Sequence, residues 1–223
     1  MTPEDALVLR EDRADGLTTL TLNRPTQFNA LSQAMLTALQ AELDAIADSE
    51  QVRVVIIAGA GKAFCAGHDL KEMRANPGKA SMQALFRQCG KLMLSITQMP
   101  QPVIARVHGI ATAAGCQLVS MCDLAVAADV AKFAVSGINV GLFCSTPAVG
   151  LARNLGRKAA LEMLLTGDFI DAMEAKTRGL VNRVVPADAL DSEVERLVQG
   201  ILAKSPVAVR MARGCSTDSW KWG

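Results

Sequence analysis

The sequence predicts an α/β fold with mostly parallel strands, on two observations. Apolar, β-branched runs alternate along the chain with segments whose apolar residues recur at helical spacing. Such alternation is typical of strands joined by crossover helices. In addition, the runs at residues 54–57 and 103–107 break into small residues, at 58–72 and 108–123, before a segment that can be helical. Two strand-turn-helix corners with free backbone N–H groups are therefore expected.

The elements of the first half can be placed in order from the N-terminus. Strand-like runs at residues 6–10 and 17–22 are joined by the turn-prone Asp15-Gly16 pair. Apolar residues then mark one helical face over residues 30–46, and Ser32 can cap that helix. The next expected elements are strand 53–58, helix 81–98, strand 102–107, helix 114–121 and strand 124–127.

Helices dominate beyond Thr146. They are expected at residues 147–155, 157–165, 171–178 and 187–204, with a strand-like run at 181–185. Asp171 can cap one of these helices and Gly179 can end it. Earlier in the chain, the polar Asn76-Pro77-Gly78 stretch is expected to be a hinge or lid. We expect a core domain of residues 1–186 followed by a C-terminal helical segment of residues 187–223.

Composition limits the partners and the compartment. A net charge of +1 argues against nucleic acid as the main partner, because phosphate binding needs a concentrated basic surface. No apolar stretch approaches the roughly 20 residues of a membrane span, so a membrane partner is not expected. The polar, acidic residues 1–16 resemble neither a secretory signal nor a transit peptide. We therefore expect a cytoplasmic protein.

Cysteine and histidine give no sign of a metal site. The six cysteines lack CxxC spacing, and the chain has only two histidines, His68 and His108. We expect no bound metal, and thiols that are reduced and mostly buried.

Five segments carry motifs in a fixed order. They are LNRPTQFNAL (22–31), AFCAGHDLKEM (63–73), PVIARVHGIATAAGCQLVSMCDLAVAAD (102–129), FAVSGINVGL (133–142) and LEMLLTGDFIDAMEAKTRGLVNRVV (161–185). In this register they resemble the enoyl-CoA hydratase/isomerase, or crotonase, superfamily. The resemblance implies a crotonase-like spiral of ββα repeats with C-terminal helices, an acyl-CoA thioester as substrate or ligand, no prosthetic group, and a homotrimer or hexamer. It also implies further helices after this chain's last residues, where GCSTDSWKWG matches nothing in the family. We expect this stretch to be a frayed or shifted terminus rather than a tail that touches a membrane or a partner.

The resemblance assigns an oxyanion hole to the two corners. The main-chain N–H groups of His68 and Ala114 would hold the thioester oxygen as it becomes negative, commonly the largest single catalytic contribution. Arg24 is a candidate contact to a CoA phosphate and, equally, a surface residue at a helix start. The expected contacts of CoA with the first corner are Ala66, His68, Asp69 and Leu70.

The acid and base of a hydratase are missing from the matching positions. Gln117 and Gly137 stand where the family's hydratases carry two glutamates. An amide cannot accept a proton at neutral pH, and glycine has no side chain. Since losing such a group typically costs about 10²–10⁴ in rate, hydratase activity is expected to be weak or absent.

Several alternatives stay open at this stage. The chain could be a family enzyme acting on acyl-CoA, a non-catalytic acyl-CoA-binding or partner-binding protein, or a decarboxylase or thioester hydrolase with water held by Gln117. Asp69 is expected to accept backbone N–H bonds rather than to act as a base. The His68 imidazole could reach the acyl pocket or lie on the surface against CoA. Cys116 and Cys144, which flank the expected pocket, are expected to be packing residues.

Overall fold

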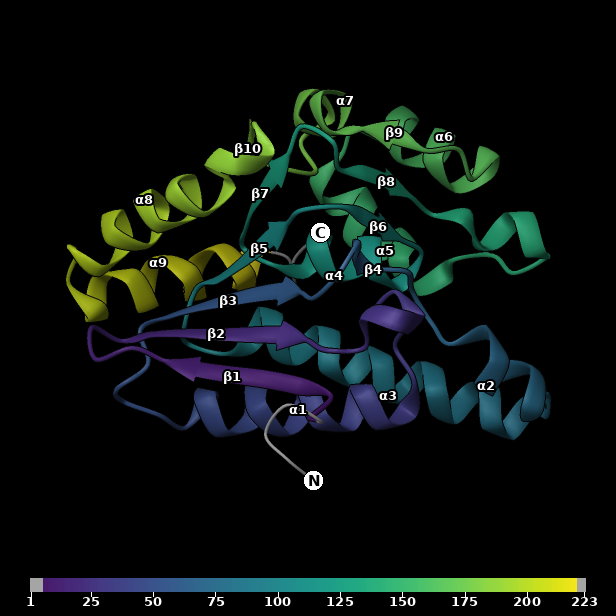
Figure 1. Cartoon of the computed structure of the whole chain (residues 1–223), viewed down its shortest axis with the longest axis horizontal. Coiled ribbons are helices and arrows are strands. Elements are labelled where there is room, and N and C mark those ends of the chain that lie inside the picture. The colour runs from purple at the N-terminus through teal and green to yellow at the C-terminus, as the bar shows by residue number, and fades with distance from the viewer. Residues whose placement is uncertain (1–5, 220–223) are drawn as a thin grey trace.

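The computed structural model describes residues 6–219, with side chains as far as residue 215. In this part of the chain two sheets form the centre, one of six strands in the order β1-β2-β3-β5-β7-β10 and one of four in the order β4-β6-β8-β9 (Figure 1). The central strands of the first, which pair with one another in parallel, are β3 (Val54–Gly59), β5 (Val103–Val107) and β7 (Leu124–Ala128). The parallel strands of the second are β4 (Ala63–Cys65), β6 (Ile110–Thr112) and β8 (Lys132–Ala134). Each longer strand is followed by a short strand in the other sheet, which produces the ββα repeat.

The edges of both sheets are less regular. β1 (Val8–Asp12) and β2 (Leu17–Leu22) form an antiparallel hairpin in which Val8 lies opposite Leu22. Its turn contains Gly16 at a φ of 95°, a conformation that glycine adopts without strain. β2 pairs in parallel with β3, and β10 (Arg183–Val185) pairs in parallel with β7 at the opposite edge. The prediction of mostly parallel strands is therefore confirmed.

The centre of the six-stranded sheet is buried on both faces. On one face Val55 and Ile57 pack with residues of α1 (Gln33–Ala47) and α3 (Lys79–Gln98). On the other, Val54 and Ile56 pack against α8 (Leu190–Leu202). Figure 1 shows α8 on the opposite side of the sheet from α1 and α3. Burial on both faces explains why β3 is a continuous apolar run rather than an alternating one.

The predicted helix caps are confirmed. The Ser32 side chain accepts a hydrogen bond from Met35 N, and Asp171 accepts one from Glu174 N. Gly179 ends its helix at a φ of 92°. The remaining elements are η2 (Pro25–Gln27), α2 (Leu70–Ala75), α4 (Ala114–Met121), η3 (Ser136–Val140), α5 (Ser145–Asn154), α6 (Arg157–Thr166), β9 (Ile170–Asp171), α7 (Ala172–Arg178) and η4 (Ala187–Ala189).

One helix was missed at the C-terminal end. α9 (Pro206–Ser219) follows the predicted last helix, so the expected fraying is wrong as far as residue 219, and residues 220–223 lie outside the described part. Arg213 fastens α9, since its buried guanidinium donates to Asp123 Oδ2 at 2.9 Å and to Thr97 O at 3.2 Å. The Thr97 carbonyl belongs to the last turn of α3, where the helix itself provides no donor.

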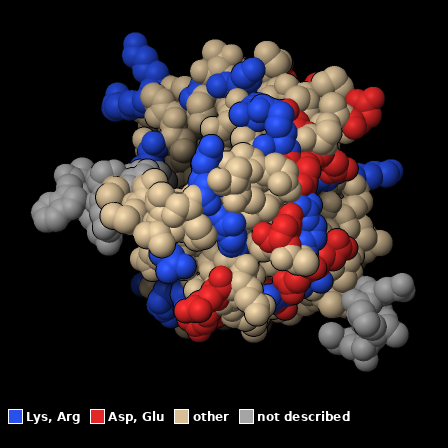
Figure 2. Space-filling model, turned by 90° about the vertical axis from the view of Figure 1, so that its left-hand side faces the viewer, with Lys and Arg blue, Asp and Glu red and all other residues tan. Residues whose placement is uncertain are grey.

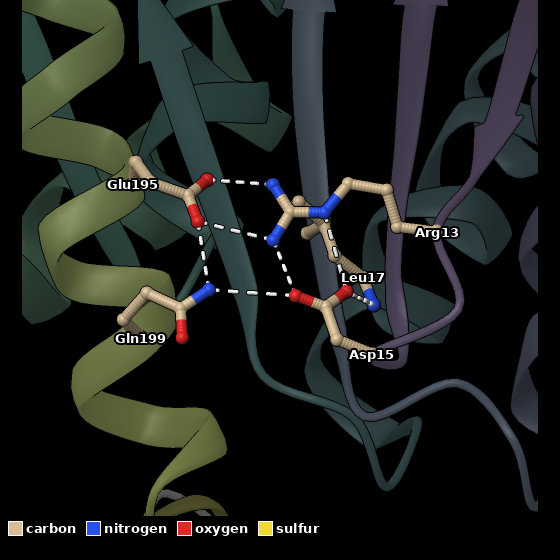
Figure 3. Close-up of polar contacts among 5 residues, drawn as sticks. All are labelled: Arg13, Asp15, Leu17, Glu195 and Gln199. Atoms are coloured by element: carbon tan, nitrogen blue, oxygen red, sulfur yellow. Dashed lines mark hydrogen bonds and ion pairs between the residues drawn. The ribbon is translucent and has the colours of Figure 1, made fainter.

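An ion-pair network holds α8 against the turn of the β1–β2 hairpin (Figure 3). Arg13 donates to Glu195 Oε2 at 2.7 Å and also binds Asp15, and Gln199 donates to Glu195 Oε1 at 2.7 Å. The hydrogen bond from Arg13 lowers the pKa of Asp15 to about 2. The side chains of Arg13, Asp15 and Glu195 are about 40% exposed, so the network contributes little to stability. Around it, acidic and basic side chains are interspersed rather than gathered by sign (Figure 2).

Candidate active site

Pairing of two short strands brings the two glycine-rich corners together. β4 and β6 are parallel, with Cys65 opposite Ala111, so the residues that follow each strand lie at the same edge. A β-carbon on Gly67 would lie 2.9 Å from Ala113 Cβ, and one on Gly115 would lie 2.1 Å from Cys65 O. Because such contacts are too close for any side chain, glycine is required for the corners to approach.

The approach leaves two backbone N–H groups free, those of His68 and Ala114. Leu31 N donates to Gly67 O, and Asp69 N donates to Leu31 O. These two bonds use the residues before and after His68, so the His68 N–H takes no part in either. Ala114 is the first residue of α4, where the N–H has no partner within the helix. Among the described residues neither N–H donates a hydrogen bond.

Backbone strain accompanies the second corner. Ala113 has a φ of 50° and a ψ of −120°, which an alanine rarely adopts and which costs on the order of 1–3 kcal/mol. Its own N–H donates to Ala134 O at 3.0 Å, which ties the turn to β8. The strain sets the direction of the peptide that carries the Ala114 N–H.

A cavity of about 130 Å³ lies beside these corners. Its wall is mainly apolar, and Leu70 and Phe143 at its mouth are each about half exposed. A mostly apolar cavity with a few polar groups is typical of a small-molecule site. The lining residues are Ala66, His68, Leu70, Met73, Phe86, Ala113, Ala114, Ser136, Gly137, Val140, Leu142, Phe143, Cys144, Ser145, Thr146 and Pro147.

The His68 side chain lies in this wall. Its ring meets the Phe86 ring edge to face, with 5.6 Å between centroids. Both ring nitrogens are buried without a hydrogen-bond partner, which costs about 1–3 kcal/mol for such a polar group. Burial lowers the pKa of His68, and the Leu31 backbone and the Glu72 carboxylate offset only part of that effect. The imidazole is therefore neutral at pH 7.

Asp69 and Arg24 bind each other. Asp69 accepts hydrogen bonds from Lys71 N at 3.0 Å and Glu72 N at 3.2 Å, which caps α2. The Arg24 guanidinium lies 3.1 Å from Asp69 Oδ2 and donates to Ala30 O at 3.0 Å. Burial acts to raise the pKa of Asp69, but the Glu72 N–H and Arg24 lower it overall. Arg24 is thus partly buried and paired with Asp69, and its contact with a CoA phosphate stays a prediction.

The two positions at which the resemblance leads us to expect glutamates, 117 and 137, differ from each other. Gln117 is 3% exposed, and its Oε1 accepts a hydrogen bond from Thr146 Oγ1 at 3.1 Å. Gly137 lines the cavity, but a β-carbon there would lie 2.6 Å from Cys144 Sγ and 2.7 Å from Leu142 O. The space beside Gly137 is therefore filled by Cys144 and Leu142. The residues that line the cavity include no carboxylate.

Comparison with known proteins decides the family. A family model for enoyl-CoA hydratase/isomerase matches residues 12–217. The chain belongs to the enoyl-CoA hydratase/isomerase family. The rat protein named enoyl-CoA hydratase domain-containing protein 3, mitochondrial, is 47% identical over 200 residues, which cover 89% of this chain and 67% of the relative. The chain thus spans about two thirds of that relative's length.

Solved structures of the family confirm the crotonase-like fold. An enoyl-CoA hydratase from Mycobacterium smegmatis is 60% identical with a TM-score of 0.93, covering 94% of this chain and 82% of that one. Human enoyl-CoA hydratase domain-containing protein 3 is 45% identical with a TM-score of 0.90, at the same coverage.

The expected cytoplasmic location is contradicted by this family comparison. The rat, mouse, human and Xenopus laevis relatives, 47–48% identical, are all named mitochondrial. The expectation rested on the polar, acidic composition of residues 1–16, and the composition of those residues alone could not decide the compartment. Separately, no helix within the described residues has the length and apolar character to cross a membrane.

Sequence reasoning missed several features of this family member's site. Phe86 comes from α3 and Thr146 from α5, and neither lies in a glycine-rich corner. Ser136 lines the cavity, and its hydroxyl oxygen lies 2.7 Å from that of Thr112. Both residues lie inside family motifs quoted above, but nothing in the sequence singled them out. His108 lies outside the lining and binds Gly61 O through Nε2 at 2.9 Å.

The cysteines are unpaired. Cys65, Cys89, Cys116, Cys122, Cys144 and Cys215 are all free thiols, and the first four are buried. Cys144 lines the cavity while Cys116 does not. Burial raises the pKa of both thiols, to about 12 for Cys116. Both are therefore protonated at neutral pH.

Proposed function

We propose that this family member binds an acyl-CoA thioester and stabilises its enolate oxygen with the N–H groups of His68 and Ala114. The supporting observation is that both unpartnered N–H groups belong to residues lining one cavity, where the glycine contacts hold the corners together. Preorganised donors of this kind act where negative charge develops and need no rearrangement during reaction.

The rest of the ligand follows from this placement. The acyl group would lie among the apolar wall residues, with the CoA moiety leaving past Ala66 and Leu70 at the mouth. CoA thioester is the only ligand proposed, without a prosthetic group. The homotrimer or hexamer implied by the family resemblance is kept as a proposal, and light scattering on the purified protein would test it.

Hydration of an enoyl thioester is proposed to be weak or absent. That reaction needs one group to take a proton from water and another to deliver one to the α-carbon. Gln117 cannot accept a proton, and its oxygen is already bound by Thr146. No carboxylate in the lining replaces it.

Paired ligands test the oxyanion contact. Butyryl-CoA has a thioester oxygen, whereas S-butyl-CoA has the same chain without it. Two neutral hydrogen bonds are worth about 0.5–1.5 kcal/mol each, so calorimetry should find butyryl-CoA bound about tenfold more tightly. Equal affinities would contradict the oxyanion hole, and binding of neither ligand would contradict acyl-CoA binding altogether.

A backbone variant assigns the contact to Ala114. Proline is tolerated at the first residue of a helix but has no N–H, so Ala114→Pro should remove one of the two hydrogen bonds and lower the difference in affinity between the two ligands to about threefold. Ala114→Gly keeps the N–H and is the matched control. Thermal unfolding of both variants checks that α4 persists.

Turnover assays separate the alternatives. Crotonyl-CoA should be hydrated slowly or not at all, and turnover at the rate of a two-glutamate hydratase would contradict the account. Release of free CoA from butyryl-CoA would identify a thioester hydrolase, and loss of carbon dioxide from malonyl-CoA a decarboxylase. Tight binding without any turnover would identify a binding protein.

A further inference from the structure

The size of the cavity limits the acyl group that can enter it. Its volume of about 130 Å³ is close to the roughly 150 Å³ of an engineered protein cavity that binds benzene. A group of about six heavy atoms therefore fits. Once the thioester carbonyl is held by the N–H groups of His68 and Ala114, room is left for about three to five further carbons.

The exposure of the lining residues shows which of them lie inside. Leu70 and Met73 are three residues apart on α2, so their side chains lie on the same face of that helix. Leu70 is 46% exposed, whereas Met73 is 8% exposed and packs in the hydrophobic core. Val140 and Phe143, which also line the cavity, are more than half exposed. The cavity therefore runs from Leu70 at its mouth inward to Met73.

Met73 has the longest side chain at the inner end. The described lining residues that are buried are Met73, Ala114 and Pro147. Ala114 carries one of the two N–H groups and has only a methyl group, and the proline ring is compact and rigid. Methionine is long, unbranched and flexible, so it fills the space that its neighbours leave. The depth open to an acyl chain is therefore set mainly by Met73.

The wall of the cavity offers nothing to a charged acyl group. Among the described residues that line it there is no Asp, Glu, Lys or Arg. Two of its hydroxyl groups already have protein partners, since Thr146 donates to Gln117 Oε1 and Ser136 lies 2.7 Å from the Thr112 hydroxyl. A carboxylate at the end of an acyl chain would meet no cation, and burial of an unpaired charge is costly.

We propose that the cavity selects uncharged acyl chains of about four to six carbons and that Met73 sets the upper limit of chain length; the inference rests on acyl-CoA binding as proposed above. A chain within the limit buries its methylene groups against the apolar wall, and each buried methylene tightens binding by about fourfold. A longer chain has to displace the Met73 side chain or stay in the mouth, so its additional methylenes add little affinity.

A series of thioesters measures the limit on the wild-type protein. Calorimetric titration with acetyl-, butyryl-, hexanoyl- and octanoyl-CoA gives a dissociation constant for each chain length. Affinity should rise about 15-fold for every two carbons from acetyl-CoA to hexanoyl-CoA, and by less than about threefold from hexanoyl-CoA to octanoyl-CoA. A steady rise through octanoyl-CoA, or no rise between acetyl-CoA and hexanoyl-CoA, would overturn the limit.

A substitution assigns the limit to Met73. Met73→Ala removes the side chain beyond Cβ and makes room for about two more methylenes, so it should bind octanoyl-CoA about tenfold more tightly than the wild type does, with little change for butyryl-CoA. Met93→Ala is the matched control, since Met93 is 1% exposed in the same core but does not line the cavity. Its ratio of octanoyl-CoA to butyryl-CoA affinity should equal that of the wild type. The same ratio in Met73→Ala would overturn the role of Met73.

A charged analogue tests the second half of the proposal. Pentanoyl-CoA and glutaryl-CoA have the same number of acyl carbons, but the glutaryl chain ends in a carboxylate. Glutaryl-CoA should bind at least about tenfold more weakly, because its carboxylate loses water and gains no partner. Equal affinities would overturn the requirement for an uncharged chain.

These results are distinguishable from failure of the proposed function. If no acyl-CoA binds, acyl-CoA binding itself is overturned, whereas binding without the expected dependence on chain length overturns only the present inference. Each comparison of variants is a ratio of two ligands on one protein, so a general loss of stability does not change it. If Met73→Ala does not fold, Met73→Val, which removes fewer atoms, gives the same comparison, and the wild-type series needs no variant.

Discussion

The two sheets of this molecule differ in burial, in strand length and in backbone strain. Helices α1, α3 and α8 cover the two faces of the six-stranded sheet, and its central strands β3, β5 and β7 are mainly apolar. The four-stranded sheet has strands of two or three residues, and at its edge lie strained Ala113, the free N–H groups of His68 and Ala114, and an unpartnered imidazole. The second sheet can contain strain and unpartnered polar groups where a ligand would bind, because the first sheet and its helices provide the stability that offsets their cost.

The largest effect is expected at the contact between the corners. Gly115→Ala puts a β-carbon 2.1 Å from the Cys65 carbonyl oxygen, and a backbone atom cannot move aside as a side chain can. We expect a loss of more than about 3 kcal/mol in the free energy of unfolding, measured by urea titration, or failure to fold. Gly200→Ala, where nothing lies within 4 Å of the added carbon, should instead stabilise α8 by up to about 1 kcal/mol.

A core substitution under the first sheet separates stability from binding. Leu39 is fully buried between α1 and the sheet, so Leu39→Ala should cost about 2–5 kcal/mol in the free energy of unfolding. Because Leu39 does not line the cavity, the affinity for butyryl-CoA at a temperature where the variant is folded should match that of the wild type. A comparable loss of affinity would show that the two sheets are not separable in this way.

A smaller effect is expected at position 137. Gly137→Ala should cost about 1–3 kcal/mol because its β-carbon meets Cys144 Sγ and Leu142 O. Adding Cys144→Ala removes the sulfur but not the carbonyl oxygen, so the double variant should recover only part of the loss in thermal unfolding. If the stability loss of the double variant equalled the sum of the losses of the two single variants, this packing would be contradicted.

The smallest effect is expected in the network of Figure 3. Arg13→Ala removes the bonds to Asp15 and Glu195, which are exposed and screened by water. The free energy of unfolding should fall by at most about 1 kcal/mol, and by less in high salt. A larger loss would mean that docking of α8 depends on this network rather than on its apolar face.

The first sheet was predictable because its signals are local. Double-sided burial makes β3, β5 and β7 apolar runs, and helical spacing marks α1 over the residues that contact the sheet. The caps Ser32 and Asp171 act within three residues of themselves. Such features can be found in a window of the sequence without knowledge of the rest of the chain.

The remaining features depend on distant contacts. Strands of three residues, such as β4 and β6, are too short to show a period. α9 depends on Arg213 reaching the end of α3, more than 100 residues earlier in the chain. Resemblance located Gly137, but only the structure shows that Cys144 fills the space beside it. The direction of the His68 side chain was likewise open until the turn around it was known.

A crystal structure of the protein with butyryl-CoA tests the central claim most directly. The account predicts the thioester oxygen within about 2.7–3.2 Å of both His68 N and Ala114 N, with the acyl chain in the cavity beside the His68 ring. A thioester bound elsewhere, or an oxygen in contact with neither nitrogen, would contradict it.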